Sequence, residues 1–432
     1  MQTSLQAIAI KAGERPTHRF QNLYKELNIG MLWQSYERLN RKAAPGVDGQ
    51  TWIAYQEELL PRLNKLVGRL KEGSYKTQLI KRVYIPKGNG KERPLGIPAL
   101  EDKIVQQSAA TLLQSIYESD FLDCSYGYRP KRSAHEAIHG LNINLQYGKY
   151  GYVVEADIKG FFDNVNHNWM LKMLEQRIDD KAFLGLISKW LKAGIMQPDG
   201  RIERPEEGTP QGGLASPVLA NIYLHHVLDI WFEKRVKPNL KSEALLVRYA
   251  DDFVCAFRYR EDAERFYRTL PKRLGKFGLE LSPEKTRLIR FSRFHPGGKR
   301  RICFLGFELY WGHDRQRRPR LHRRTAKKKL VQAVKGMGEW IKQFRHLPLA
   351  DFRIALNRRL RGHYQYFGLI GNSRQVWLYY KEVIERVYKW LNRRSQRRSY
   401  TWVGLNEMLR QQGILKPEVR KLNFPRTYLI YE

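Results

Sequence analysis

An Asp-Asp pair between two apolar runs limits how the middle of the chain can fold. Residues 245–257 read Leu-Leu-Val-Arg-Tyr-Ala-Asp-Asp-Phe-Val-Cys-Ala-Phe, with Asp251 and Asp252 at the centre. Runs rich in apolar and β-branched residues on both sides predict two strands joined by a tight turn that carries both acids. Adjacent ionised carboxylates repel each other, so the turn needs a counter-charge, which a divalent cation with oxygen ligands supplies. For an isolated Asp-Asp pair, a solvated turn would be the better explanation.

A second acidic strand upstream favours the metal site. Residues 152–159 read Tyr-Val-Val-Glu-Ala-Asp-Ile-Lys, and a break follows at Gly160. If this strand pairs beside the hairpin, Asp157 joins the two later acids in a three-carboxylate cluster, with Ile158 next to the metal. Such a cluster can hold two Mg²⁺ ions about 4 Å apart, as in in-line phosphoryl transfer, and Mn²⁺ is a possible substitute. One ion would lower the pKa of a primer 3′-hydroxyl, and the other would neutralise the leaving pyrophosphate.

The charge balance indicates a polyanionic partner. The 432 residues include 78 Lys and Arg against 43 Asp and Glu, a net charge of +35. Such an excess repels itself unless a polyanion neutralises part of it, so nucleic acid is the natural partner, bound in a salt-sensitive way. An anionic membrane is the alternative, but no apolar run approaches the roughly 20 residues of a membrane span, and no signal peptide is visible.

The cysteines argue against structural zinc. Cys124, Cys255 and Cys303 lie far apart and show no Cys/His ligand spacing. An odd number of cysteines without a secretion signal suits a reducing compartment, so a cytoplasmic protein is expected.

The two acidic segments together resemble the active site of reverse transcriptases. They read Tyr-Ala-Asp-Asp at 249–252 and Asp-Ile-Lys-Gly-Phe-Phe-Asp at 157–163, and they are most similar to the bacterial group II intron-encoded enzymes, also called maturases. The resemblance covers most of the chain. It implies an α+β right-hand polymerase fold with fingers, a palm made of an antiparallel sheet and helices, and an α-helical thumb, the maturase X domain.

The resemblance divides the chain into four parts. Residues 1–78 are expected to form an N-terminal extension and the start of the fingers, and residues 79–310 the rest of the fingers and the palm. Residues 311–330, which are rich in cations, are expected to be a basic linker, and 331–432 the helical thumb or maturase domain. Some family members continue into a Cys/His-bearing endonuclease domain; none follows here, so self-supplied cleavage of a DNA target is not expected.

Three segments resemble the parts of the family that hold the nucleotide and template. Residues 82–98 resemble the fingers hairpin, which implies that Lys87 and Arg93 meet the triphosphate, Lys as a point charge and Arg as a fork. A solvated basic hairpin is the alternative. Residues 125–135 resemble a template-contacting segment in which Arg129 is a candidate phosphate contact. Tyr249, beside the acids, is a further candidate nucleic-acid contact.

A ring and an irregular loop are expected to complete the nucleotide site. Phe162 occupies the place of the aromatic residue that lies beneath the sugar in the family and favours dNTP over rNTP; the alternative is that Phe161 and Phe162 both belong to the core. Residues 207–217 contain two prolines and three glycines, which predict an irregular loop that a nucleic-acid strand can approach closely. The family pattern puts Gln211 near the nascent base pair. Pro217 is predicted to start a helix capped by Ser216.

The remaining candidates lie toward the C-terminus. Lys285 resembles the lysine proposed to protonate leaving pyrophosphate in polymerases, although a solvent-facing lysine is an equally good explanation. Residues 304–307 match the last palm motif, a hairpin that grips the primer end, with Gly306 as a contact. Thumb helices are predicted at 352–367 and 376–391. Their basic and aromatic residues suit the groove of a duplex, and Arg358 and Arg361 are candidate contacts.

The sequence therefore predicts an RNA-directed DNA polymerase that uses an RNA template, a DNA primer, dNTPs and Mg²⁺. The resemblance further implies binding to a group II intron RNA and its DNA target, help in splicing that RNA, and copying of it after insertion. Two alternatives remain: a splicing cofactor that no longer polymerises, and a free-standing relative recruited to DNA repair or phage defence. The three acids and the Gln211 loop count against the first, and the sequence does not separate the second. The oligomeric state is left open.

Overall fold

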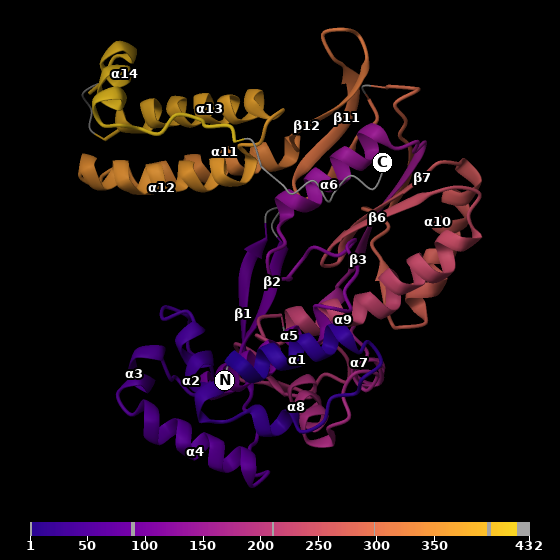
Figure 1. The fold of residues 1–432 in the computed structure, drawn as a ribbon. Coiled ribbons are helices and arrows are strands. Elements are labelled where there is room, and N and C mark those ends of the chain that lie inside the picture. Colours follow the sequence, from indigo (N-terminus) through magenta and orange to yellow (C-terminus); the bar gives the residue numbers. More distant parts are fainter. Residues whose placement is uncertain (1, 88–90, 210, 298, 395–398, 421–432) are drawn as a thin grey trace. The chain divides into compact units, whose positions relative to one another are not determined.

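The computed structural model describes residues 2–87, 91–209, 211–297, 299–394 and 399–420. The chain forms two compact units (Figure 1). The first contains Met1–Ala134 and Val154–Leu288, and the second contains His135–Val153 and Ile289–Glu432. Within the described residues, no helix is both long enough and apolar enough to cross a membrane.

The N-terminal part of the first unit is helical. Its elements are α1 (Gln2–Glu14), η1 (Leu23–Glu26), α2 (Ile29–Arg38), α3 (Trp52–Gln56), α4 (Leu59–Lys71) and α5 (Leu100–Tyr117). Side-chain caps start two of them, because Asn28 accepts from the Met31 N–H at the start of α2 and Thr51 accepts from the Ala54 N–H at the start of α3. Helix α5 is buried on most of its surface, and α1 and α2 pack against it.

The loop that precedes α3 is fastened to the start of α5. Asp48 Oδ2 accepts a hydrogen bond of 3.0 Å from the Leu100 N–H, which caps α5 from outside the helix. Lys103 Nζ donates to the Ala44 carbonyl at 2.7 Å. A Cβ on Gly46 would lie 2.6 Å from the Pro98 carbonyl oxygen, so only glycine permits this approach. The loop thus has a structural role at this helix.

Two sheets follow in the first unit. Strands β1 (Ile80–Lys87) and β2 (Lys91–Ile97) form an antiparallel hairpin that is extended by β4 (Ile195–Met196) and β5 (Ile202–Glu203) in the order β2-β1-β4-β5. The larger sheet has the order β6-β7-β3-β8, from β6 (Ala244–Tyr249), β7 (Asp252–Phe257), β3 (Tyr152–Lys159) and β8 (Glu280–Leu281), and β9 (Arg287–Arg290) also pairs with β3. This antiparallel sheet is the one expected for the palm.

The first unit contains further helices besides the N-terminal ones. They are α7 (His167–Leu174), α8 (Lys181–Leu191), α9 (Ser216–Leu224), two π-helical turns η3 (His225–Asp229) and η4 (Phe232–Val236), the short η5 (Lys237–Asn239), and α10 (Arg260–Gly275). Helix α10 packs on β7 and β8 through its apolar face, which includes Phe266, Leu270 and Leu274. The positive φ of Gly278 marks the turn after it, as the glycine predicts.

The second unit combines a small sheet with long helices. Strands β10 (Ile302–Phe304), β11 (Phe307–His313) and β12 (Pro319–Thr325) form a meander, with α6 (Ala134–Tyr147) in the same unit. Helices α11 (Lys327–Phe344), α12 (Leu349–Phe367) and α13 (Ser373–Leu391) run alongside one another, and α14 (Trp402–Gln411) follows (Figure 1). Their common core includes Leu330, Ile341, Leu356, Val383 and Val387. Both predicted thumb helices, 352–367 and 376–391, lie within α12 and α13.

The prediction of a basic linker over 311–330 is wrong. Strand β12 pairs with β11 from Phe307↔Thr325 to His313↔Pro319, and α11 begins at Lys327. The turn between the strands is held by Asp314 Oδ1, which accepts from the backbone N–H groups of Gln316 and Arg318, both at 2.9 Å. The arginines gave the segment the composition of a linker, but Leu321 and Thr325 alternate with them and are buried. The division into units also falls at Leu288–Ile289 and not near residue 310.

Candidate active site

The acidic hairpin forms as predicted. Tyr249 pairs with Asp252 at the end of β6 and β7, so Ala250 and Asp251 make a two-residue turn. The acids differ slightly from expectation, since Asp251 lies in the turn and Asp252 is the first residue of β7. Ala250 has a φ of 55°, a left-handed conformation that costs a residue with a side chain on the order of 1 kcal/mol or more. The surroundings must therefore hold this turn in place.

The buried side chain of Arg248 holds the backbone of this turn in place. Arg248 is fully buried and donates to Asp229 through Nε at 2.7 Å and through Nη2 at 2.5 Å. The other N–H groups reach Asn221 Oδ1 at 3.1 Å, the Ala250 carbonyl at 3.2 Å and Ser125 Oγ at 2.7 Å. All five guanidinium donors are thus satisfied. Asp229 is 0% exposed as well, so the pair is a buried ion pair that fixes the turn backbone. Sequence reasoning missed it, although an arginine within an apolar strand was the available signal.

The segment around Gly127 supports the same turn from the other side. A Cβ on Gly127 would lie 2.5 Å from the Ala250 nitrogen, so glycine is required there. Asn221 Nδ2 donates to the Gly127 carbonyl at 2.6 Å. Tyr128 follows with a φ of 57° and a side chain that is 44% exposed. Burial raises the pKa of Tyr128, and the charge of Asp251 raises it further, so its phenol lies in the field of the acid.

The prediction that Arg129 contacts a phosphate is wrong. Its side chain is 4% exposed and binds Glu118 at 2.8 Å. Its remaining N–H groups donate to the carbonyls of Leu122, Ser125 and Glu118, so no donor is left for a ligand. Arg129 is a structural residue, and its neighbour Tyr128 is the residue of this segment that lies near the acids.

Asp157 lies on the strand next to the hairpin, as predicted. Strand β3 is hydrogen-bonded to β7, the strand that begins with Asp252. Asp157 Oδ2 accepts a hydrogen bond of 2.7 Å from Lys285 Nζ. Burial raises the pKa of Asp251, the charge of Asp157 raises it further, and Lys285 and Arg93 lower it. Two acids and two cations of the predicted site therefore share one electrostatic environment.

The acids suit a divalent cation in their chemistry. Their carboxylate oxygens are hard ligands, and a cation would favour the charged form of Asp251, whose pKa is raised first by burial and then by the charge of Asp157. The side chains are not arranged as a finished ligand set, because the described residues contain no group of three or more His, Cys, Asp or Glu that could hold a metal ion. The ammonium of Lys285 supplies the positive charge beside Asp157. The Ile158 side chain has no ligand atom, so this residue could contribute only its backbone carbonyl oxygen to a metal site.

Phe162 and Gln211 line one cavity of about 350 Å³, together with Arg82. Phe161 is 2% exposed and belongs to the core, whereas Phe162 is half-buried. One ring is therefore in the core and the other is accessible. The segment is a short helical turn, η2 (Phe161–Asp163). The Phe162 carbonyl accepts from the Thr209 N–H at 2.7 Å, which joins this turn to the Gln211 loop.

Two glycines let this loop approach its neighbours. Gly212 has a φ of 122°, and a Cβ there would lie 2.2 Å from the Gly96 carbonyl oxygen of β2. Gly208 has a φ of 95°, and a Cβ there would lie 2.8 Å from the Asp163 carbonyl oxygen. The Gly96 N–H donates to the Gln211 carbonyl at 2.6 Å. The backbone of Gln211 is thus fixed between the β1–β2 hairpin and the Phe162 turn.

The helix after the loop begins one residue earlier than predicted. Ser216 is the first residue of α9, Ala215 is its N-cap, and no side chain of the N-cap residue caps it. The Ser216 hydroxyl lies 2.9 Å from the Thr209 hydroxyl, so it fastens the loop and does not cap the helix. The prediction of Ser216 as the cap is wrong.

The remaining site residues predicted from the sequence lie on β1, β2 and β6 of the first unit and in the second unit. Arg93 is exposed on β2, opposite Ile85. Lys87 ends β1, but its side chain and the hairpin tip at 88–90 lie outside the described residues. Tyr249 is half-buried at the end of β6. In the second unit, Gly306 follows Leu305 in the turn between β10 and β11, both with positive φ, and Arg358 and Arg361 are exposed on α12.

Comparison with known proteins identifies the class. Residues 85–309 match the family described as "Reverse transcriptase (RNA-dependent DNA polymerase)". This segment is more than half of the chain, so the chain belongs to the reverse transcriptase family, and the right-hand polymerase fold predicted for it is confirmed. Enzymes of this family generally use divalent metal ions.

Individual relatives point to the group II branch. The chain is 30% identical to the group II intron-encoded protein LtrA of Lactococcus lactis, over 86% of this chain and 74% of LtrA. It is 40% identical to protein YkfC of Escherichia coli over 49% of this chain and 62% of YkfC. It is 34% identical to the putative COX1/OXI3 intron 1 protein of Saccharomyces cerevisiae over 60% of this chain and 36% of that protein. The predicted membership among group II-like reverse transcriptases is confirmed.

Proposed function

We propose that this protein extends a DNA primer on an RNA template by nucleotidyl transfer that depends on two Mg²⁺ ions. The observation that carries the proposal is the adjacency of β3 and the β6–β7 hairpin, which puts Asp157 beside the turn of Asp251 and Asp252. The raised pKa of Asp251, caused by burial and then by Asp157, supports a site that takes up positive charge. Oxygen-only ligands suit a hard divalent ion, for which Mg²⁺ is the proposal and Mn²⁺ a possible substitute.

Each residue then has a role in the transfer. Bound divalent ions lower the pKa of the primer 3′-hydroxyl and neutralise charge on the phosphates. The three acids would hold these ions, and Ile158 would contribute its backbone carbonyl oxygen. Arg93, whose charge already acts on Asp251, binds the triphosphate as a fork, together with Lys87.

The cavity that Phe162 and Gln211 line is proposed to receive the sugar and base. Phe162 contacts the sugar of the incoming nucleotide, where its ring leaves no space for a 2′-hydroxyl. Gln211, held by backbone hydrogen bonds on both sides of its loop, supports the nascent base pair. Because both residues line one cavity, the choice of sugar and the fit of the base pair are set at the same place.

Lys285 is the proposed general acid. Its ammonium lies 2.7 Å from Asp157, so it is already close to the site of transfer. From there it can donate a proton to the oxygen of the leaving pyrophosphate, a step for which general acids contribute about 10²–10⁴ in rate.

The second unit is proposed to bind RNA. Arg358 and Arg361 are exposed on α12, and the net charge of +35 requires a polyanionic partner. By similarity to LtrA, the partner is a group II intron RNA, whose splicing the protein assists, and the DNA target of that intron. A free-standing role in repair or defence is the second candidate, and the presence or absence of a group II ribozyme in the flanking DNA separates the two.

The test of the polymerase is direct. Purified protein should extend a DNA primer annealed to an RNA template when dNTPs and Mg²⁺ are added, and Asp251→Asn should abolish extension. Asp199→Asn is the matched control, because Asp199 pairs with Arg201 on the exposed surface. Wild-type protein that binds RNA without extending any primer would identify a splicing-only maturase. Extension that survives Asp251→Asn would refute the assignment of the acids.

A further inference from the structure

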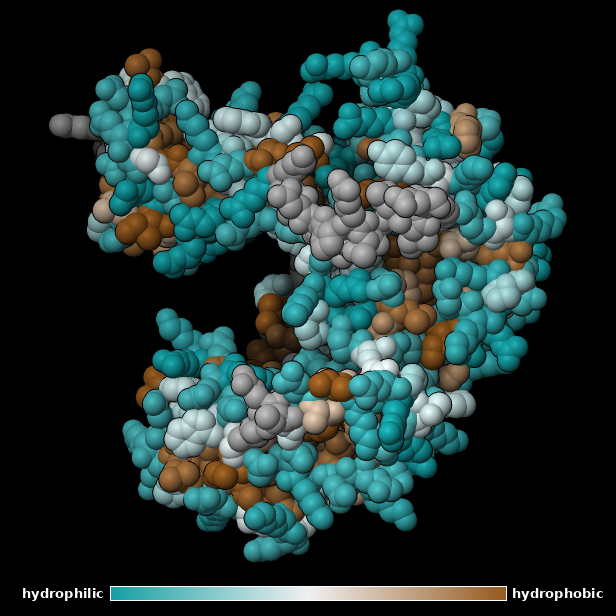
Figure 2. Space-filling model, in the orientation of Figure 1, coloured by the Kyte–Doolittle hydropathy of each residue, from teal (hydrophilic) through white to brown (hydrophobic). Residues whose placement is uncertain are grey.

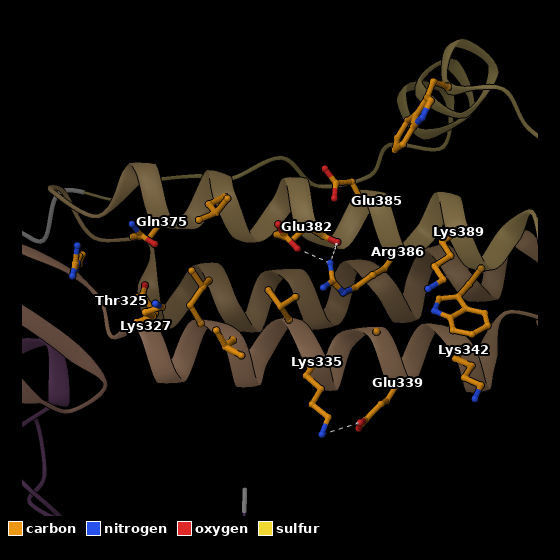
Figure 3. Close-up of a pocket in the computed structure, with 18 residues that line it drawn as sticks. Thr325, Lys327, Lys335, Glu339, Lys342, Gln375, Glu382, Glu385, Arg386 and Lys389 are labelled. Atoms are coloured by element: carbon orange, nitrogen blue, oxygen red, sulfur yellow. Dashed lines mark hydrogen bonds and ion pairs between the residues drawn. The ribbon is translucent and has the colours of Figure 1, made fainter. Parts of the chain in front are cut away.

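The helices of the second unit enclose a long groove that the catalytic proposal does not use. The groove lies along α11 and α13, ends near α14, and has a volume of about 1060 Å³ (Figure 3). Its floor is apolar and includes Leu330, Val331, Val334 and Leu378. Val331 is 57% exposed and Leu378 39% exposed, so part of this floor faces solvent. On the visible face of these helices, apolar residues appear among hydrophilic ones (Figure 2).

The acids of the groove are neutralised by their own helices. Glu382 pairs with Arg386 at 2.7 Å, Glu339 with Lys335 at 3.9 Å, and Glu385 with Lys381 at 4.0 Å. Each pair has the i, i+4 spacing that lets neighbours on one helix face meet, and Figure 3 shows the pairs of Glu339 and Glu382. Lys327, Lys342 and Lys389 also line the groove, and among the described residues none of their ammonium groups forms an ion pair with an acid. The uncompensated charge of the groove is therefore positive.

This charge is concentrated around Trp390 at one end of the groove. Four cations lie near the centroid of its ring, namely Lys342 at 5.6 Å, Arg345 at 5.3 Å, Lys389 at 5.5 Å and Arg393 at 5.6 Å. The ring attracts each of them, but the cations repel one another. In the part of the chain that the structure describes, none of the four forms an ion pair with an acid. A polyanion would remove this repulsion.

An exposed aromatic stack stands at the same end. Trp402 lies on Tyr388 with ring centroids 4.0 Å apart and planes 13° apart, and it is 43% exposed. Both Trp402 and Trp390 line the groove. Aromatic rings on which bases stack, next to cations that hold phosphates, are the features by which proteins bind single-stranded nucleic acid.

We propose that this groove binds a single-stranded segment of RNA. A base extends the Tyr388–Trp402 stack, and Lys342, Lys389 and Arg393 hold the adjacent phosphates. A duplex keeps its bases stacked inside and would leave the exposed indole unused, so the observations favour a single strand. The inference rests on the proposed RNA binding and deepens it, because it names the form of RNA and the residues of a site that contains none of the catalytic acids.

The experiment uses the full-length protein and fluorescence anisotropy with a labelled, unstructured single-stranded RNA and, separately, a blunt RNA–DNA duplex. Trp402→Ala should weaken binding of the single strand by about 5- to 150-fold. The double variant Lys342→Gln/Lys389→Gln should lower the salt slope of log K by about 1.4, two phosphate contacts at about 0.7 each. Circular dichroism melting checks that each variant is folded.

Two variants of the same helix serve as controls. Trp377→Ala removes an indole that is 46% exposed on α13 but does not line the groove. Arg374→Gln removes an exposed cation of α13 that also lies outside the groove lining. Both should bind the single strand as tightly as the wild type, which separates the groove from the general charge of the surface.

Three results would overturn the proposal. The groove variants could bind single-stranded RNA as tightly as the controls. Their affinities for the single strand and for the duplex could fall by the same factor, which would indicate a non-selective basic surface. They could bind RNA with unchanged affinity but bind a labelled acidic amphipathic peptide more weakly than the wild type, which would indicate that the groove binds a protein helix. Wild-type protein that binds single strands through Trp402 but extends no primer would refute the polymerase and leave the groove assignment intact.

Discussion

The ammonium of Lys285 lies 2.7 Å from Oδ2 of Asp157, on the strand that neighbours the β6–β7 hairpin. The lysine therefore neutralises one of the acids proposed to hold metal, and its charge also lowers the pKa of Asp251. If Asp157 holds a divalent ion as proposed, Lys285 and that ion would compete for the same carboxylate. In the proposed reaction, the general acid Lys285 and the metal ligand Asp157 are therefore hydrogen-bonded to each other before substrate binds.

The competition predicts opposite effects of Lys285→Ala on metal binding and on catalysis. Mn²⁺ should bind up to about fivefold more tightly, since an ion pair with an exposed lysine contributes about 1 kcal/mol or less. Single-nucleotide incorporation should slow by about 10²-fold or more, because the general acid is lost. Electron paramagnetic resonance of free Mn²⁺ measures the first effect, and rapid-quench kinetics measures the second. Lys285→Arg keeps the charge and is the control; Mn²⁺ affinity that is equal in all three proteins would show that Lys285 does not compete with the metal.

The raised pKa of Asp251 predicts a pH-dependent gain in stability when the acid is removed. A carboxyl whose pKa is higher in the folded state than its ordinary 3.8 binds more protons when folded, so it stabilises the fold at low pH and loses that contribution as the pH rises through the folded pKa. Without divalent ions, Asp251→Asn should therefore melt at a higher temperature than the wild type at pH 7. The difference should vanish below about pH 3.8.

Mg²⁺ provides the control for this effect. The ion should raise the melting temperature of the wild type at pH 7 and change that of Asp251→Asn little, because the variant lacks a ligand. Differential scanning fluorimetry with and without Mg²⁺ gives both comparisons. A variant that is less stable than the wild type at pH 7 would contradict the raised pKa.

The ion pair beneath the turn predicts a large loss of stability. Arg248→Ala leaves Asp229 charged and buried, which should lower the free energy of unfolding by about 3–5 kcal/mol. Arg201→Ala, at an exposed ion pair, should leave urea unfolding unchanged. Arg248→Lys restores the charge but not the fork to Asp229 or the bond to the Ala250 carbonyl. It should therefore recover more of the stability than of the primer extension, and equal recovery of both would show that Arg248 does not position the turn.

Much of the site was predictable because local patterns determine it. The apolar runs around Asp251 specify the hairpin, and the strand that carries Asp157 can pair at only a few positions in an antiparallel sheet. The errors arose where tertiary contacts decide the outcome. Arg129 has the chemistry of a phosphate contact, but Glu118 and three carbonyls of the same unit satisfy it. The arginines of β12 have the composition of a linker, yet pairing with β11 makes that segment a strand.

The tight approach at Gly212 predicts a specific loss of nucleotide binding. In Gly212→Ala, the new Cβ meets the Gly96 carbonyl oxygen and the φ of 122° is strained, so the loop must move and carry Gln211 with it. The KM for dNTP should rise while the RNA–DNA duplex still binds. Gly68→Ala is the matched control, because nothing lies within 4 Å of its Cβ in α4 and alanine favours the helix by about 1 kcal/mol. Unchanged steady-state KM values in Gly212→Ala would refute the role of the loop.

The two adjacent phenylalanines predict two different phenotypes. Phe162 is half-buried and lines the 350 Å³ cavity, so Phe162→Ala should admit a 2′-hydroxyl and raise the use of rNTP relative to dNTP by about 10- to 200-fold. Phe161 is 2% exposed, so Phe161→Ala should instead lower the free energy of unfolding by about 3–5 kcal/mol without changing sugar selectivity. Primer extension with each nucleotide type and urea unfolding of both variants measure these effects. Since the residues are neighbours in one short turn, a general disturbance of that turn would affect both assays in both variants, whereas the proposed division of roles requires each variant to fail only one of them.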